Sequence, residues 1–152
     1  MEIEKKYRLR ELPLDLENGE SILQGYIVAE KDEARLRRKG GQCFLTCKND
    51  GTLSREEWEV EIPEWVFDIL WQKTEGRRIE KFRYSKKMPF GLTLEVDIYL
   101  NHLKGLITLE VEFPSEASAN SFTLPEGIQG EDVTCDKRYK NKNLALYGLP
   151  KD

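Results

Sequence analysis

Histidine is almost absent from this 152-residue chain, in which His102 is the only one. A single histidine excludes mechanisms that need a His pair or a Ser-His or Cys-His couple. Cysteine is also scarce, since Cys43, Cys47 and Cys135 are an odd number without C-x-x-C spacing. They argue against a disulfide framework and against a thiolate zinc site. A metal bound here would have oxygen ligands, which favours magnesium, manganese or calcium over zinc or copper.

Long apolar runs are missing too, because no stretch approaches the roughly 20 apolar residues that cross a bilayer. Residues 1–10 contain no apolar signal-peptide core, so we expect a cytoplasmic protein without a membrane partner. The formal net charge of −4 gives no general basic footprint, and nucleic acid is therefore not an expected partner. A chain of 152 residues suits a single domain over residues 1–152.

Turn residues, among them Asn18-Gly19, recur at short spacing, and most segments between them alternate with period two. This pattern predicts a mainly β fold of the α+β class. Antiparallel strands are expected near residues 1–9, 22–30, 33–39, 43–48, 53–62, 78–86, 91–100, 105–113 and 131–139. Helices are expected from Pro63 to Glu75, over residues 115–122 and over residues 142–148.

Charged side chains occupy one face of at least seven of these strands, because residues i and i+2 of a strand share a face. An ordinary solvated sheet face would explain any single pair. Here, however, acidic and basic pairs occupy separate strands with almost no neutral spacers. Adjacent like charges repel, so the segregation implies cations for the carboxylates and an anion for the basic cluster. That basic cluster comprises Lys6, Arg35, Arg37, Lys48, Lys81 and Arg83.

A closed sheet of about eight strands has an interior that can hold one small ligand. We therefore predict an eight-stranded antiparallel closed β-barrel, a tunnel with a charged interior and a few helices packed outside. The basic cluster suits phosphate, because arginine binds phosphate through two parallel hydrogen bonds. The carboxylates would repel a polyanion unless divalent cations bridge them to phosphate oxygens.

An ordered series of motifs resembles the CYTH superfamily, also called triphosphate tunnel metalloenzymes. It begins with the E-x-E-x-K pattern Glu2-Ile3-Glu4-Lys5-Lys6 and covers nearly the whole chain. The later members are Gln24-Gly25-Tyr26, Arg35-Leu36-Arg37, Leu45-Thr46-Cys47-Lys48, Lys81-Phe82-Arg83-Tyr84, Glu95-Val96-Asp97, Glu110-Val111-Glu112-Phe113 and Asp136-Lys137-Arg138-Tyr139.

The resemblance implies a tunnel that binds triphosphate and one or two Mg²⁺ or Mn²⁺ ions. It implies metal ligation by Glu2, Glu4, Glu110 and Glu112. It implies that the basic cluster holds the phosphates. It also implies catalytic roles, in a second metal environment or in orienting water, for Glu57, Glu59, Glu95 and Asp97.

The function implied is metal-dependent hydrolysis of inorganic triphosphate with release of phosphate, by a monomer or homodimer. The alternatives are a class IV adenylate cyclase, a nucleotide or thiamine triphosphatase, and a non-catalytic polyphosphate-binding module. An organic base needs an aromatic or apolar surface, yet Trp58 points outward by parity and Trp65 and Trp71 are expected in the core. No stacking residue is thus expected to face the tunnel. The acidic pairs favour an enzyme over a binding module.

Overall fold

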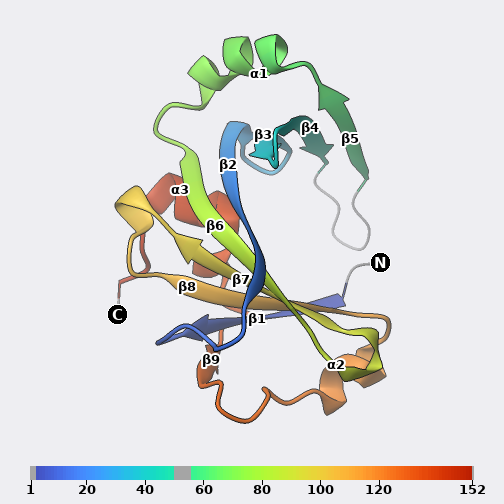
Figure 1. Cartoon of the computed structure of the whole chain (residues 1–152). Helices are drawn as coiled ribbons and strands as arrows, with labels where there is room; N and C mark the ends of the chain where they lie inside the picture. Colours follow the sequence, from blue (N-terminus) through green and yellow to red (C-terminus); the bar gives the residue numbers. More distant parts are fainter. Residues whose placement is uncertain (1–2, 50–55, 152) are drawn as a thin grey trace.

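The structure, a computed structural model, describes residues 3–49 and 56–151, and within these ranges nine antiparallel strands form one sheet. Their hydrogen-bonded order is β5-β4-β3-β2-β6-β7-β8-β1-β9, so β1 lies between β8 and β9. Figure 1 shows that the sheet is strongly curved. The strands are β1 (Ile3–Leu9), β2 (Glu17–Ala29), β3 (Glu33–Lys39), β4 (Gln42–Lys48), β5 (Glu57–Ile62), β6 (Arg78–Lys87), β7 (Thr93–Tyr99), β8 (Ile107–Phe113) and β9 (Gly130–Asp132).

All nine strands expected from the sequence are present. Eight of them match the number predicted for the barrel, and the ninth, β9, has only three residues. β5 and β9 are the two edges of the hydrogen-bonded order. Within the described ranges no ladder joins these two edges. The predicted mainly β, antiparallel fold is therefore confirmed, as one strongly curved sheet of nine strands.

Two strand boundaries differ from the prediction by five residues or more. Asn18-Gly19 is not a turn but part of β2, where the register with β6 shifts between Glu17 and Glu20 and Asn18 has a φ of 57°. These two residues therefore form a β-bulge inside the strand instead of a turn between strands. The strand predicted over 131–139 ends at Asp132, because its carboxylate accepts hydrogen bonds from the backbone and hydroxyl of Thr134 and turns the chain.

All three predicted helices are confirmed. They are α1 (Glu64–Trp71), α2 (Glu116–Ser121) and α3 (Asn141–Tyr147). Pro63 precedes α1, and Ser115 caps α2 by accepting a hydrogen bond from the backbone of Ser118. No helix in the described part of the chain is both long and apolar enough to span a membrane.

Helices α1 and α2 cover the outer, apolar face of the sheet. Phe67 of α1 packs on buried Leu36 and Cys43. Ala119 of α2 belongs to the core under β1, β7 and β8. Trp71 stacks on Phe67 with ring centroids 5.2 Å apart, but Trp65 is 67% exposed and does not join the core as predicted. Trp65 lies only two positions from Phe67, and residues at that spacing face different sides of a helix.

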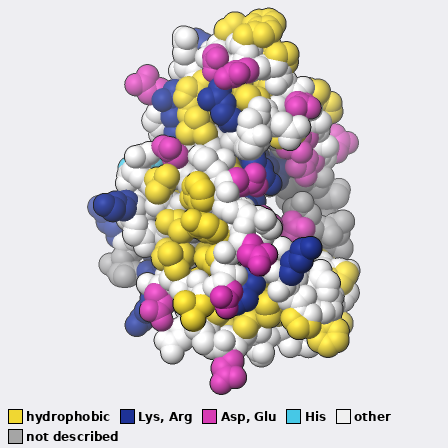
Figure 2. Space-filling view, viewed as in Figure 1, with side chains coloured by type: hydrophobic (Ala, Val, Ile, Leu, Met, Phe, Trp, Pro, Cys, Tyr) yellow, Lys and Arg dark blue, Asp and Glu magenta, His cyan; other side chains and the backbone are white. Residues whose placement is uncertain are grey.

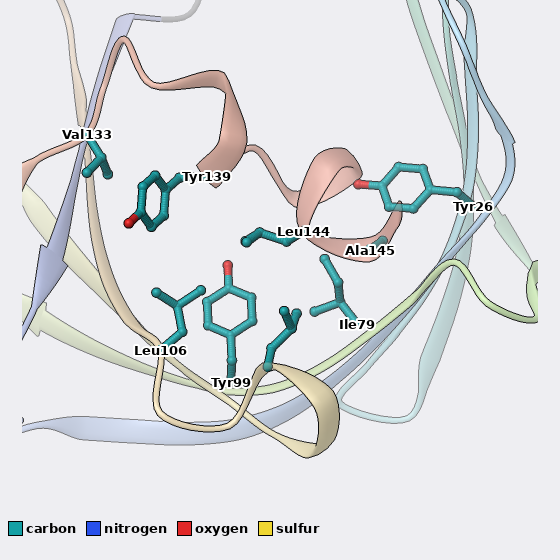
Figure 3. Packing of buried hydrophobic residues seen from close by; sticks show 9 residues of the cluster. Tyr26, Ile79, Tyr99, Leu106, Val133, Tyr139, Leu144 and Ala145 are labelled. Carbon is teal, nitrogen blue, oxygen red and sulfur yellow. The ribbon is translucent and has the colours of Figure 1, made fainter. Parts of the chain in front are cut away.

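Helix α3, unlike α1 and α2, packs on the inner face of the sheet. Figure 3 shows Leu144 and Ala145 of α3 pointing toward Tyr26, Ile79 and Tyr99, which project from the inner face of β2, β6 and β7. All five residues are buried. The concave side of the sheet is therefore apolar and filled at one end, and the charged residues occupy the remainder.

Candidate active site

The charged faces of the strands meet around one cavity of about 400 Å³ on the concave side of the sheet. This volume lies in the range of small-molecule sites. Figure 2 shows Lys and Arg side chains in the depth of a hollow bordered by acidic side chains. The predicted site residues that line the cavity are Glu4, Lys6, Arg35, Arg37, Lys48, Glu57, Arg83, Glu95, Glu110 and Glu112.

The basic side of the cavity has the positive charge and the hydrogen-bond donors to bind an anion. Arg35 has a buried Nε without a hydrogen-bond partner among the described residues. Burial, together with the positive charges of Arg35 and Arg83, lowers the pKa of Arg37 to about 10. Such mutual repulsion is relieved by a bound anion, and phosphate oxygens match the geometry of guanidinium groups.

The acidic side of the cavity brings like charges face to face. Glu4 lies opposite Glu112 in the β1–β8 pair, and Glu95 lies opposite Glu110 in the β7–β8 pair. Lys6 offsets part of this charge, since its Nζ is 3.4 Å from Glu110 Oε1. Directly opposed like charges destabilise a sheet, so both pairs would be stabilised by a cation between them.

The carboxylates suit a hard divalent cation, which prefers oxygen ligands. In residues 3–49 and 56–151, however, no three acidic, histidine or cysteine side chains already converge on one point. Glu2, the remaining predicted ligand, lies outside the described residues. The paired carboxylates therefore fit the chemistry of a divalent metal, while the described side chains alone do not complete its coordination.

Lys81 and Asp97 share the predicted face but do not line the cavity. They form a buried ion pair with Nζ and Oδ2 2.8 Å apart. Asp97 also accepts two hydrogen bonds from Arg83, of 2.7 and 2.9 Å. The Arg83 Nη1 lies 2.8 Å from Glu95 Oε2. Lys81 and Asp97 therefore lie beneath Arg83, and Asp97 fixes the orientation of its guanidinium.

Lys81 gives the folded protein a specific pH dependence. Burial lowers its pKa from 10.5 to about 8, although the charge of Asp97 opposes this shift. The folded state thus releases this proton at a lower pH than the unfolded chain, so its stability rises between these two values. We expect the free energy of unfolding of the wild type, minus that of Lys81→Met, to increase by about 2 kcal/mol from pH ~7.5 to ~9.5.

Urea unfolding of both proteins at the two pH values measures this change. Lys87→Met, at the exposed end of the same strand, controls for the loss of a lysine. A wild-type minus Lys81→Met difference that falls with pH would contradict the depressed pKa of Lys81.

The predicted acids of β5 are divided between two hollows. Glu57 lines the main cavity, and its Oε1 is 3.9 Å from Lys48 Nζ. Glu59 instead lines an adjoining hollow of about 330 Å³, which shares Arg37 with the main cavity. There Glu59 accepts a 2.7 Å hydrogen bond from the Thr46 hydroxyl. Arg37 therefore lies at the boundary between the two hollows.

The segment after β9 forms a wall of the main cavity that sequence reasoning missed. The Lys6 ammonium donates a hydrogen bond to the Tyr139 carbonyl. Lys142 of α3 donates to the Glu30 carbonyl at 3.0 Å and lies 3.6 Å from the Glu33 carboxylate. The lining residues not predicted are Tyr26, Glu33, Val133, Thr134, Asp136, Tyr139, Lys140, Asn141 and Lys142. The polar motif from Asp136 to Tyr139 was the available signal.

Two tyrosines line the cavity, into which no stacking residue was expected to point. Tyr26 and Tyr139 both line it. They are only 1% and 3% exposed, however. Neither ring therefore offers a free face on which an organic base could stack.

Known proteins resemble this chain along almost all of its length. No protein-family model matches the sequence. An inorganic triphosphatase of Nitrosomonas europaea is 46% identical over 147 residues, 95% of this chain and 97% of that protein. An inorganic triphosphatase of Acetivibrio thermocellus is 40% identical over 148 residues, 95% of this chain and 92% of that protein.

Solved structures give the same result. The crystal structure of an inorganic triphosphatase matches with a TM-score of 0.78 and 42% identity, covering 99% of this chain and 97% of that one. An adenylyl cyclase homologue from Hippeastrum with a dominant triphosphatase activity has a TM-score of 0.58 at 18% identity over 79% of this chain and 83% of that one, which shows the fold alone. The chain belongs to the CYTH family of triphosphate tunnel metalloenzymes, among its inorganic triphosphatases.

Proposed function

We propose that this protein hydrolyses inorganic triphosphate, with release of phosphate, in the 400 Å³ cavity. The observation that carries the proposal is the meeting of separate basic and acidic strands around that one cavity. A triphosphate has the charge to engage Arg35, Arg37 and Arg83 together. Its own charge also explains why the carboxylates opposite require cations.

In this proposal, Lys6, Lys48 and the cavity-lining arginines bind the phosphates. Glu4, Glu110 and Glu112 would hold one or two Mg²⁺ or Mn²⁺ ions, together with Glu2 outside the described residues. When bound, such an ion would neutralise charge on phosphoryl oxygens and favour in-line attack by water. Glu57 and Glu95 line the same cavity and would orient that water.

The proposed roles of three predicted residues are changed by their positions. Asp97 and Lys81 lie beneath Arg83, so we assign them to positioning this arginine. Glu59 lies in the adjoining hollow, so we assign it to the environment of Arg37. None of the three needs to touch the substrate in order to influence catalysis.

The limited aromatic surface favours inorganic triphosphate over a nucleotide or thiamine triphosphate. We expect phosphate release from tripolyphosphate with Mg²⁺ or Mn²⁺, and none after chelation. We expect kcat/KM for ATP or thiamine triphosphate to be at least ~10-fold lower. The described lining of the cavity has no exposed aromatic face that would offset the cost of removing an organic base from water. A phosphate, pyrophosphate and cyclic AMP assay over the three substrates, with and without each metal, measures this.

Each other outcome identifies an alternative. Cyclic AMP formed from ATP would establish a cyclase. Faster hydrolysis of ATP or thiamine triphosphate would establish an organic triphosphatase. Tripolyphosphate binding without any product would establish a non-catalytic polyphosphate-binding module.

A further inference from the structure

Gln24 is a polar residue in a position where an apolar one would be expected. It lies on the inner face of β2, between Ile22 and Tyr26 and opposite Ile79 of β6. Its side chain is completely inaccessible. A buried amide destabilises a protein unless both of its ends are hydrogen-bonded. The Gln24 amide is therefore expected to hold neighbouring polar groups in place through hydrogen bonds.

Both ends of the Gln24 amide are engaged, and their chemistry fixes its orientation. Arg37 lies directly opposite Gln24 in the β2–β3 pair, and its Nε donates to Gln24 Oε1 at 2.9 Å. Because an arginine Nε–H can only donate, the amide oxygen must face Arg37. The amide nitrogen then faces the Tyr26 hydroxyl, to which it donates at 2.9 Å.

The group that holds Arg37 is neutral, whereas the groups that hold Arg83 are negatively charged. Arg83 is held by the carboxylates of Asp97 and Glu95, which neutralise much of its charge. Arg37 is held at Nε by a neutral amide instead. A neutral anchor fixes the plane of the guanidinium and leaves its full positive charge and its two terminal nitrogens available to a phosphate.

We propose that Gln24 is a positioning residue, which acts on the bound triphosphate only through Arg37 and sets the direction of that guanidinium at the boundary of the two hollows. The inference rests on the proposed function. It adds that the strength of triphosphate binding depends on a buried residue that does not reach the substrate. A carboxylate at this position would hold Arg37 as well but would cancel the charge.

A double-mutant cycle in the full-length protein tests the proposal. Gln24→Leu is expected to raise KM for tripolyphosphate about 10-fold with kcat changed by less than about threefold, as for a lost hydrogen bond to a charged group. In the Arg37→Gln background, Gln24→Leu is expected to change KM by less than about twofold, because coupled residues are not additive. Additive effects in the two backgrounds would overturn the proposal.

Thr74→Val provides the matched control for a general loss of stability. Thr74 is as inaccessible as Gln24, but it lies below Trp71, where it hydrogen-bonds the Trp71 carbonyl and Arg78. This variant is expected to unfold more easily and to keep the wild-type KM. A KM raised equally by Thr74→Val would show that Gln24 acts through stability alone.

A second measurement does not depend on catalysis. The hydrogen-bonded Nε–H of Arg37 should give a slowly exchanging NMR signal in the wild type, and Gln24→Leu should lose that protection. Retained protection would overturn the positioning role even if the wild type proved inactive. An inactive wild type with the expected NMR result would instead contradict only the proposed function.

Discussion

Asp97→Ala is expected to lower the free energy of unfolding by about 3–5 kcal/mol, because it leaves two buried cations without their shared carboxylate. Asp97 is 1% exposed and contacts Lys81 at 2.8 Å and Arg83 at 2.7 Å. Lys81 cannot turn to water, since its side chain has no exposed surface. Arg83, whose side chain is 11% exposed, keeps only its contact with Glu95. Urea unfolding at neutral pH measures the loss.

The pH dependence of this loss follows from the pKa of Asp97. Burial alone would raise that pKa, but the charges of Lys81 and Arg83 outweigh burial and hold it well below its usual value of 3.8. The stabilisation is thus complete above about pH 3.8 and is lost only as pH falls from there through the lower folded value. The titration of Asp97 itself therefore adds no pH dependence to the wild-type minus Asp97→Ala difference between pH ~5 and ~7. A change in this range would report Lys81, whose pKa falls further once the charge of Asp97 is removed.

Glu95→Ala is the matched control, since it removes the other carboxylate that contacts Arg83. The Glu95 side chain is 32% exposed, so its ion pair is screened by water. We expect a cost below about 1 kcal/mol. Equal costs for the two variants would mean that the buried network does not hold Arg83.

Glu110→Gln is expected to reduce kcat/KM for tripolyphosphate about 1000-fold, the scale of several kcal/mol of charge stabilisation by a bound metal. The substitution keeps the shape of the side chain but removes the carboxylate that lies opposite Glu95 and 3.4 Å from Lys6. The half-saturating magnesium concentration should rise as well. Initial rates over a magnesium titration measure both effects.

Glu131→Gln controls for the removal of a carboxylate away from the cavity. Glu131 lies in β9, pairs with Arg8 at 3.1 Å and is 63% exposed at its side chain. Its substitution should leave both the rate and the magnesium dependence unchanged. If Glu110→Gln behaved in the same way, Glu110 would not be a metal ligand, and the acidic side of the cavity would need another explanation.

The face on which each charged residue lies could be predicted from sequence, because alternate residues of a strand must point to opposite sides. Arg35, Arg37 and Glu110 reach the cavity for this reason. Alternation does not predict how far along the tunnel each of these residues lies. Lys81 shares the face of Arg83, but it lies opposite Tyr99, at the end of the sheet that α3 fills.

The wall after β9 could not be predicted because long-range contacts place it. The backbone of Lys6 bonds both the Thr134 hydroxyl and the Val133 backbone, across more than 120 positions of sequence. No local periodicity encodes such contacts. Gln24 was visible as part of a motif, but its role depends on a partner that only the β2–β3 register identifies.

The place of β1 between β8 and β9 delays folding during synthesis. When β1 leaves the ribosome, its partner strand over residues 107–113 has not yet been synthesised. At about 5–20 residues per second, roughly 100 residues take about 5–20 s. An unpaired strand is prone to aggregate over such a time. Lys5 and Lys6 place two positive charges in this strand, and such charges disfavour its pairing with other chains.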